Sequence, residues 1–273
     1  MRITSKIVTL ILLIVFFVGF CVLLYPAVSQ YWNSRVQSKA VASYEQLLDS
    51  IDRDATDSIF EKAYAYNKAL SELSFPLTQY SKLTDYDAAL NMNENGMMGY
   101  ISIDKIQVEL PIYHHINSQI LNVACGHMEG TSFPVGGEGT HCVLSAHRGL
   151  PTAKLFTDLD KLEIGDTFRI TILDKVLTYE VDQIKIVLPD NLNDIQIEDG
   201  MDYVTLLTCT PYGINTHRLL VRGHRIETIL QKQYYITSEA FLIDRLIVTP
   251  LVAIPILIVL IIYVFFRPDK KRY

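Results

Sequence analysis

The chain has 273 residues, of which 49% are hydrophobic, and its formal net charge is −6 at pH 7. An acidic chain without a basic stripe or interleaved aromatic residues is not suited to general nucleic-acid binding, and the sequence contains no Walker or Rossmann glycine loop. Its length allows one large domain or two small ones, and any segment embedded in a membrane reduces the length available for them.

The chain opens with an almost continuously apolar run, Ile7 to Leu24, which is about long enough to cross a bilayer. Basic residues precede the run and interfacial aromatic residues follow it: Arg2, Lys6, Tyr25, Tyr31 and Trp32. We expect a cytoplasmic tail over residues 1–6 and a transmembrane anchor over residues 7–29. A cleaved signal peptide is the alternative, because Ala27-Val28-Ser29 would serve as a small-residue cleavage site.

Residues 30–95 are expected to form a helical N-terminal region. Apolar residues recur there at helical spacing, in two stripes: Tyr44, Leu47, Leu48 and Ile51, then Ile59, Ala63, Tyr66, Leu70 and Leu73. The polar stretch Asp52 to Asp57 separates the stripes. The sequence therefore predicts two helices between Arg35 and about Phe75, packed against the main domain.

From about residue 96 the apolar period becomes that of β-strands. Strand-like runs cover residues 100–103, 168–172, 177–181, 203–207 and 219–221, and turn glycines lie between them. Leu155 to Leu162 is predicted to form a short helix between strands. About eight short strands with turn signals are typical of a closed β-barrel or a sandwich, which we place in residues 96–228.

One cysteine stands out within these strands. Cys209 ends the apolar run Thr205–Cys209, a Pro-Tyr-Gly turn follows, and a second β run begins beside Arg218. A hairpin would bring Arg218 level with Cys209. A cationic neighbour lowers the pKa of a thiol and increases the nucleophilic thiolate. A buried structural cysteine is the alternative interpretation.

A cysteine nucleophile needs a proton-transfer partner, and His147 is the candidate. It ends the strand pattern Cys142–Ser145 just before Gly149, where a histidine can project into a cleft. A capped or core histidine is the alternative. The other histidines are weaker candidates, because they lack metal-ligand spacing or point away from a useful neighbour: His114, His115, His127, His141, His217 and His224.

The other cysteines suggest neither zinc nor a second nucleophile. Cys21 lies inside the first apolar run. Cys125 and Cys142 could form a disulfide or could be small buried apolar residues, and we favour burial.

A second apolar run, Leu246 to Phe266, is also long enough to span a bilayer. We expect a juxtamembrane linker over residues 229–245, a transmembrane helix over 246–266 and a basic cytoplasmic tail over 267–273. A buried core helix is the alternative. Because positive charge flanks the outer ends of both apolar runs, both termini are predicted to be cytoplasmic, with the middle of the chain outside the cell membrane.

Several motifs, in order, carry a resemblance to a known family. They are Gly126–Gly137, Ser145–Pro151, Leu155–Leu159, the Thr-Leu-x-Thr-Cys motif of Thr205–Cys209, and its continuation from Pro211 to Arg225. Together they resemble class C (pilin-polymerising) sortases of Gram-positive bacteria, from about Gly96 to Arg225. The resemblance implies a mainly β fold, a sortase-like closed eight-stranded β-barrel, here joined to N-terminal helices and a transmembrane helix at each end.

The same resemblance implies that His147, Cys209 and Arg218 are the catalytic residues. It implies cleavage of a Leu-Pro-x-Thr-Gly-like motif between Thr and Gly through a thioacyl-enzyme, and transfer to a pilin lysine or a cell-wall amine. No cofactor or metal is required. Two alternatives remain: a thiol hydrolase that uses the same trio but transfers the acyl group to water, and a non-catalytic membrane-anchored pilus-assembly scaffold in which Cys209 is merely buried.

One segment departs from the family pattern. Class C sortases usually carry a lid with an Asp-Pro-aromatic motif ahead of the barrel, whereas the window Ser74–Asp87 contains Asp85-Tyr86 but no Asp-Pro pair. The lid is therefore expected to be absent, shortened or built differently.

Overall fold

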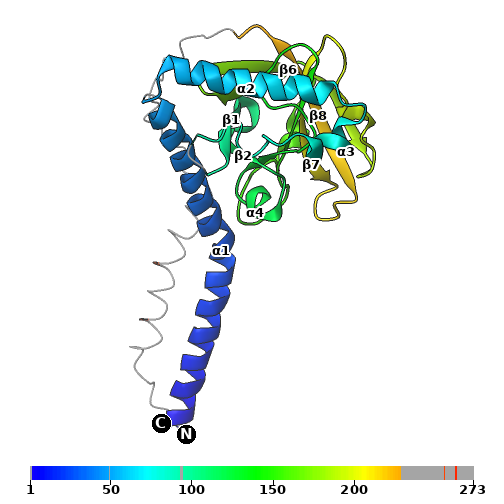
Figure 1. Ribbon diagram of the computed structural model, residues 1–273. Helices are drawn as coiled ribbons and strands as arrows, with labels where there is room; N and C mark the ends of the chain where they lie inside the picture. Colours follow the sequence, from blue (N-terminus) through cyan, green and yellow to red (C-terminus); the bar gives the residue numbers. More distant parts are fainter. Residues whose placement is uncertain (1, 49, 93–94, 229–254, 256–261, 263–273) are drawn as a thin grey trace. The chain divides into compact units, whose positions relative to one another are not determined.

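The computed structural model describes residues 2–48, 50–92, 95–228, 255 and 262 (Figure 1). The predicted linker 229–245 and basic tail 267–273 lie outside these residues, as does nearly all of the predicted C-terminal span 246–266. The protein divides into two compact units, one formed by Gln30–Ile229 and the other by residues 1–29 and 230–273.

The N-terminal helix α1 extends over Arg2–Leu48. Its segment Ile11–Leu48 reaches a mean hydropathy of 2.8 and is the one helix among the described residues that is long and apolar enough to cross a membrane. A signal sequence near an N-terminus would meet the same criterion. The C-terminal part of α1 is tied to the barrel by Tyr44, whose hydroxyl donates to the carbonyl of Met98 at 2.7 Å and accepts from the amide of Leu173 at 2.9 Å.

The second predicted helix is α2, Arg53–Ser71, and it begins earlier than the sequence suggested. The expected polar break over Asp52–Asp57 is wrong in its length. Asp52 alone takes the extended N-cap conformation, with φ −73° and ψ 148°, and Asp54 occupies the first turn, where a negative charge is favourable. Asn67 fastens α2 to the barrel, because its side-chain amide exchanges hydrogen bonds of 3.2 and 2.7 Å with the backbone of Phe133.

Eight strands form a closed barrel in the order β1-β2-β3-β4-β7-β8-β6-β5. They are β1 (Met97–Ile103), β2 (Val108–His114), β3 (Cys125–His127), β4 (Thr140–Ser145), β5 (Thr167–Ile172), β6 (Lys175–Val187), β7 (Asp202–Thr210) and β8 (His217–Ile226). The short helices are α3 (Pro76–Gln79), α4 (Ser118–Leu121), and the 3₁₀ turns η1 (Tyr80–Lys82), η2 (Asp104–Ile106), η3 (Leu159–Lys161) and η4 (Asn193–Ile195). The predicted mainly β fold and closed barrel are therefore confirmed.

The short helix expected over Leu155–Leu162 is mostly absent. Only the 3₁₀ turn η3 forms there, and Leu155, the first residue of the segment, has a φ of +43°, outside the right-handed helical region. The strand-like runs of the sequence, in contrast, all lie within strands of the barrel.

Most neighbouring strands pair antiparallel, but β2 with β3 and β4 with β7 pair parallel. The barrel interior is filled by apolar side chains, including the stacked rings of Phe168 and Tyr179, whose centroids are 5.6 Å apart. Gly223 on β8 leaves room for this stack, since a Cβ there would lie 2.7 Å from the Phe168 ring. The parallel β4–β7 pair matters for the site, because the carboxyl ends of both strands meet at one edge.

Candidate active site

Cys209 and Arg218 face each other across the β7–β8 hairpin. They are direct partners in the antiparallel register, as the sequence predicted, and paired residues present their side chains on the same face of a sheet. The thiol of Cys209 is partly exposed, whereas the flanking Thr208 and Thr210 are 1% and 7% exposed. The cysteine therefore lies on the outer face of the barrel, and its neighbours turn inward.

His147 reaches the same place through the parallel pairing of β4 with β7. The register aligns Ser145 with Leu207, and two hydrogen bonds extend it: the amide of Ala146 donates to Leu207 at 3.2 Å, and Thr208 Oγ1 donates to the Ala146 carbonyl at 2.8 Å. Two residues beyond the Ser145–Leu207 pair lie His147, just after the end of β4, and Cys209, on β7. The three residues predicted from sequence are thus brought together at one edge of the barrel.

The environment of His147 favours the neutral imidazole. Its side chain is half-buried, and this burial lowers its pKa below the ordinary value for histidine. Its carbonyl accepts a hydrogen bond of 3.1 Å from the amide of Phe156, which holds the backbone in place. A neutral ring of this kind can accept a proton from a thiol or an amine.

Arg218 differs from its neighbour Arg222 in how its charge is compensated. Among the described residues, the guanidinium of Arg218 donates only to backbone carbonyls, those of Asn215 at 3.1 Å and His217 at 3.0 Å. Arg222 instead forms two 3.0 Å bonds to Asp182 and lies 4.0 Å over the ring of Tyr203. Arg218 therefore has hydrogen-bond donors that a developing negative charge could recruit, whereas Arg222 is held in a structural ion pair.

An apolar groove leads up to Arg218. It is a cavity of about 190 Å³ between β4, β7, β8 and the β6–β7 connection, and its wall includes Ser145, Val187, Leu188, Leu207, Leu220 and Arg218. Leu207 precedes Cys209 by two residues, so both side chains project on the same face of β7.

The window Ser74–Asp87, which corresponds to the lid of class C sortases, forms two short helical turns. It contains α3 and η1, and it packs closely on Gly130, where a Cβ would lie 2.9 Å from both Leu77 and Tyr80. Leu77 joins Met128 and Leu207 in the apolar cluster of the groove. Tyr86 is buried elsewhere, with its hydroxyl 2.9 Å from Nδ1 of His127. Of the two tyrosines of this window, Tyr86 is therefore anchored to the barrel and does not plug the groove.

Cys125, Cys142 and His141 are buried residues of the barrel. Cys125 and Cys142 are unbonded and fully buried, and burial raises the pKa of both thiols, so the disulfide alternative is not observed. His141 is bonded to the carbonyl of Gln196 at 2.7 Å and to Thr205 at 2.8 Å. In the described part of the chain, no group of three or more potential ligands could hold a metal ion.

Sequence reasoning missed one polar residue beside the site. Arg148 follows His147 directly, forms an ion pair with Asp160 and reaches Thr210 Oγ1 at 3.5 Å. Its position immediately after the candidate histidine was the one available signal, but its partner Asp160 lies in the turn η3, which no local pattern connects to it.

Comparisons with known proteins agree with this geometry. The Sortase domain family matches residues 101–226. The crystal structure of sortase C1 from Streptococcus agalactiae is 47% identical, with a TM-score of 0.66 over 70% of this chain and 100% of that chain. The sortase C structure from Streptococcus pneumoniae is 42% identical, with a TM-score of 0.64 over 70% of this chain and 97% of that chain.

Sortase D of Bacillus subtilis is 30% identical over 131 residues, which are 47% of this chain and 63% of that protein, so the match spans less than two thirds of this relative. The class C structures are covered almost completely and at higher identity. This chain therefore belongs to the sortase family of cysteine transpeptidases and, within it, to the class C sortases.

Proposed function

We propose that this chain is a membrane-anchored transpeptidase that joins pilus subunits. It cleaves a Leu-Pro-x-Thr-Gly-like sorting motif between Thr and Gly and transfers the acyl group to a lysine amine of a pilin, or finally to a cell-wall amine. Cys209 is the nucleophile, His147 the acid and base, and Arg218 the hydrogen-bond donor. The observation that carries the proposal is the register: Cys209 pairs with Arg218, and β4 runs beside β7 toward His147.

The reaction has two halves. The Cys209 thiolate attacks the carbonyl carbon of the motif threonine, and the C–N bond to glycine breaks as His147 gives a proton to the leaving amine. The incoming lysine amine then attacks the thioester, His147 takes its proton, and the thiolate leaves. Burial lowers the pKa of His147 below the ordinary value of about 6.5 for an imidazole. The neutral imidazole that burial favours is the form that accepts a proton in each half of the reaction.

Arg218 supports the charged intermediate. Its guanidinium donates to the carbonyls of Asn215 and His217 in this structure. In the tetrahedral intermediate, the oxyanion would take the place of these carbonyls as the acceptor. Removing one such donor typically raises the barrier by about 3–4 kcal/mol. The groove beside it, with Leu207 and Leu220 in its wall, suits the leucine of the sorting motif.

The proposed arrangement in the cell follows from the apolar and basic segments. The N-terminal run anchors the enzyme, the catalytic barrel is outside the membrane, and the basic flanks keep both termini in the cytoplasm. The domain boundaries given above from the sequence are proposed with it.

The test uses the full chain in membranes with a pilin that bears the sorting motif. We expect covalent ladders with the native enzyme and a thioacyl intermediate trapped on Cys209. Cys209→Ala should abolish both, and Cys21→Ala, which alters an exposed cysteine of α1, should retain both. Motif cleavage that yields only hydrolysed product, even with added amine, would favour the thiol hydrolase. Ladders formed by Cys209→Ala would refute the assignment.

A further inference from the structure

Arg148 is a nearly buried cation beside the proposed trio. Its side chain is 11% exposed, its Nη2 pairs with Asp160, and its Nη1 lies 3.5 Å from Thr210 Oγ1. Its Nε is buried and has no partner in the described part of the chain. Asp160 is thus the carboxylate that compensates a charge shielded from water, and a buried charge that loses its partner is strongly unfavourable.

The contacts of Arg148 join the two backbones that carry the trio. Arg148 is the residue after His147, and Thr210 is the residue after Cys209. The loop beyond Arg148 is held by two further hydrogen bonds of 3.1 Å, from Phe156 to the His147 carbonyl and from Gly149 to Thr157 Oγ1. A guanidinium can serve two partners in fixed directions, which the single ammonium of lysine does less well.

We infer that Arg148, held by Asp160, is a positioning residue that sets the distance and orientation between His147 and Cys209. It touches neither substrate nor the reacting atoms. This inference rests on the proposed function, since it assigns Arg148 a role through His147 and Cys209.

The test compares two variants, Arg148→Lys and Asp160→Asn, with the control variant Arg169→Lys. Arg169 is a suitable control because it forms an exposed 2.8 Å ion pair with Asp104 on the barrel wall. The full chain is assayed for kcat and KM separately, and for the pH profile of Cys209 alkylation by iodoacetamide. We expect kcat to fall at least about tenfold in both variants with little change in KM, and the alkylation profile to shift. Arg169→Lys should change neither.

The Asp160→Asn variant should fold, because the side chain of Asp160 is exposed. If its kcat and alkylation profile are unchanged, the inference is wrong. Activity that survives Cys209→Ala would instead refute the proposed function, so the two failures are distinguishable.

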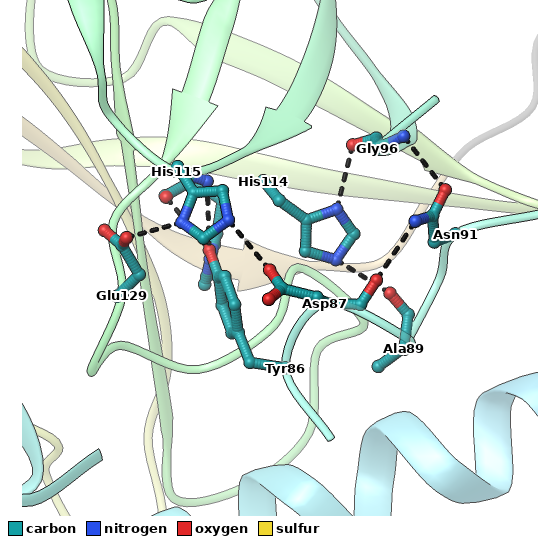
Figure 2. A network of polar contacts seen from close by, with 9 residues as sticks. Tyr86, Asp87, Ala89, Asn91, Gly96, His114, His115 and Glu129 are labelled. Carbon is teal, nitrogen blue, oxygen red and sulfur yellow. Dashed lines mark hydrogen bonds and ion pairs between the residues drawn. The ribbon is translucent and has the colours of Figure 1, made fainter. Parts of the chain in front are cut away.

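A separate cluster lies where the segment before β1 meets the barrel, and Figure 2 shows it. The ring of His115 lies between two carboxylates, with Nδ1 2.6 Å from Glu129 and Nε2 2.8 Å from Asp87. A neutral imidazole has one N–H donor, so both bonds form only with the protonated ring. Asp87 belongs to the segment that follows η1, whereas Glu129 follows β3. The protonated ring therefore links the segment to the barrel.

The groups around His115 come from every element packed there. His114 on β2 faces two carbonyls, those of Gly96 and Ala89, each at 2.8 Å, and Tyr86 of the segment packs against both histidine rings. His127 on β3 is neutral, because burial lowers its pKa to about 3. Burial raises the pKa of Tyr66 on α2, and the negative charges of Glu129 and Asp87 contribute to this rise.

The sign of the pH effect follows from these neighbours. Burial lowers the pKa of His115, but the carboxylates of Glu129 and Asp87 outweigh it and raise the pKa above the ordinary value. Burial lowers the pKa of His114, so that ring loses its proton first as the pH rises. The bond from His115 is complete below about pH 6.5 and is lost as the pH rises through its raised pKa.

We propose that His115 is a pH-dependent clasp that fastens the segment Tyr86–Ala89 to the barrel through Asp87 and Glu129. The clasp opens as the pH rises and the ring of His115 loses its proton.

Hydrogen exchange of the full chain between pH 5.5 and 8.5, corrected for intrinsic exchange rates, measures the opening of residues 84–92. We expect several-fold more opening at the high end in the native protein, and no such pH dependence in His115→Gln or in Asp87→Asn. His217→Gln is the control, because its ring has no carboxylate partner in the described residues. The same pH dependence in native protein and Asp87→Asn would overturn the proposal.

Discussion

Replacing Thr208 by valine tests how the trio is assembled. Thr208 is 1% exposed, and its hydroxyl donates to the carbonyl of Ala146 at 2.8 Å, which ties the residue before Cys209 to the residue before His147. Valine keeps the shape of the side chain and removes the donor. The perturbation is therefore a single lost hydrogen bond between the two strands that position the trio.

The expected magnitudes follow from burial. A buried group that loses its hydrogen-bond partner costs about 1–3 kcal/mol, which lowers the Tm of a domain of this size by about 2–12 °C. A displacement of about 1 Å between reacting groups can cost about 100-fold in rate, so we expect kcat to fall about 10- to 100-fold with KM little changed.

Two matched variants make the test sharp. Thr208→Ser keeps the hydroxyl and should keep most of the turnover. Thr205→Val removes a buried bond of the same length, 2.8 Å to His141, but on the opposite face of β7 from Thr208, so it should lower the Tm and leave kcat nearly unchanged. Thermal unfolding and single-turnover cleavage of a motif peptide measure both quantities. If Thr208→Val matches the native protein in Tm and kcat, the reasoning is wrong.

Three further predictions concern the proposed trio and the topology. Arg218→Ala should lower kcat by about 100- to 1000-fold in peptide cleavage, while Arg225→Ala, which alters an arginine over the Tyr179 ring, should not. Because burial lowers the pKa of His147, the acid limb of the kcat/KM profile should lie below about pH 6.5, and a limb above that value would contradict the proton-transfer role. A tag placed after Tyr273 should resist protease added to intact cells while the barrel is cleaved, and a digested tag would exclude the proposed topology.

Local patterns in the sequence were sufficient for much of this protein. The apolar run before Leu24 predicted a helix that can span a membrane, and alternation predicted the strands. The pairing of Cys209 with Arg218 was also predictable, because a hairpin register depends on a short turn between adjacent strands. Where a local pattern failed, as over Leu155–Leu162, backbone conformation imposed by the surrounding loop overrode helix propensity.

Tertiary structure alone decided the rest. The parallel pairing of β4 with β7 directs His147 toward the end of β7 that carries Cys209, and the register of a parallel pair between distant segments leaves no signature in either segment. Two sets of ion pairs also join residues from separate elements: Arg148 with Asp160, and His115 with both Asp87 and Glu129. Charged side chains look alike in a sequence whether they are solvated or buried, and only the folded barrel determines which of them must find a partner.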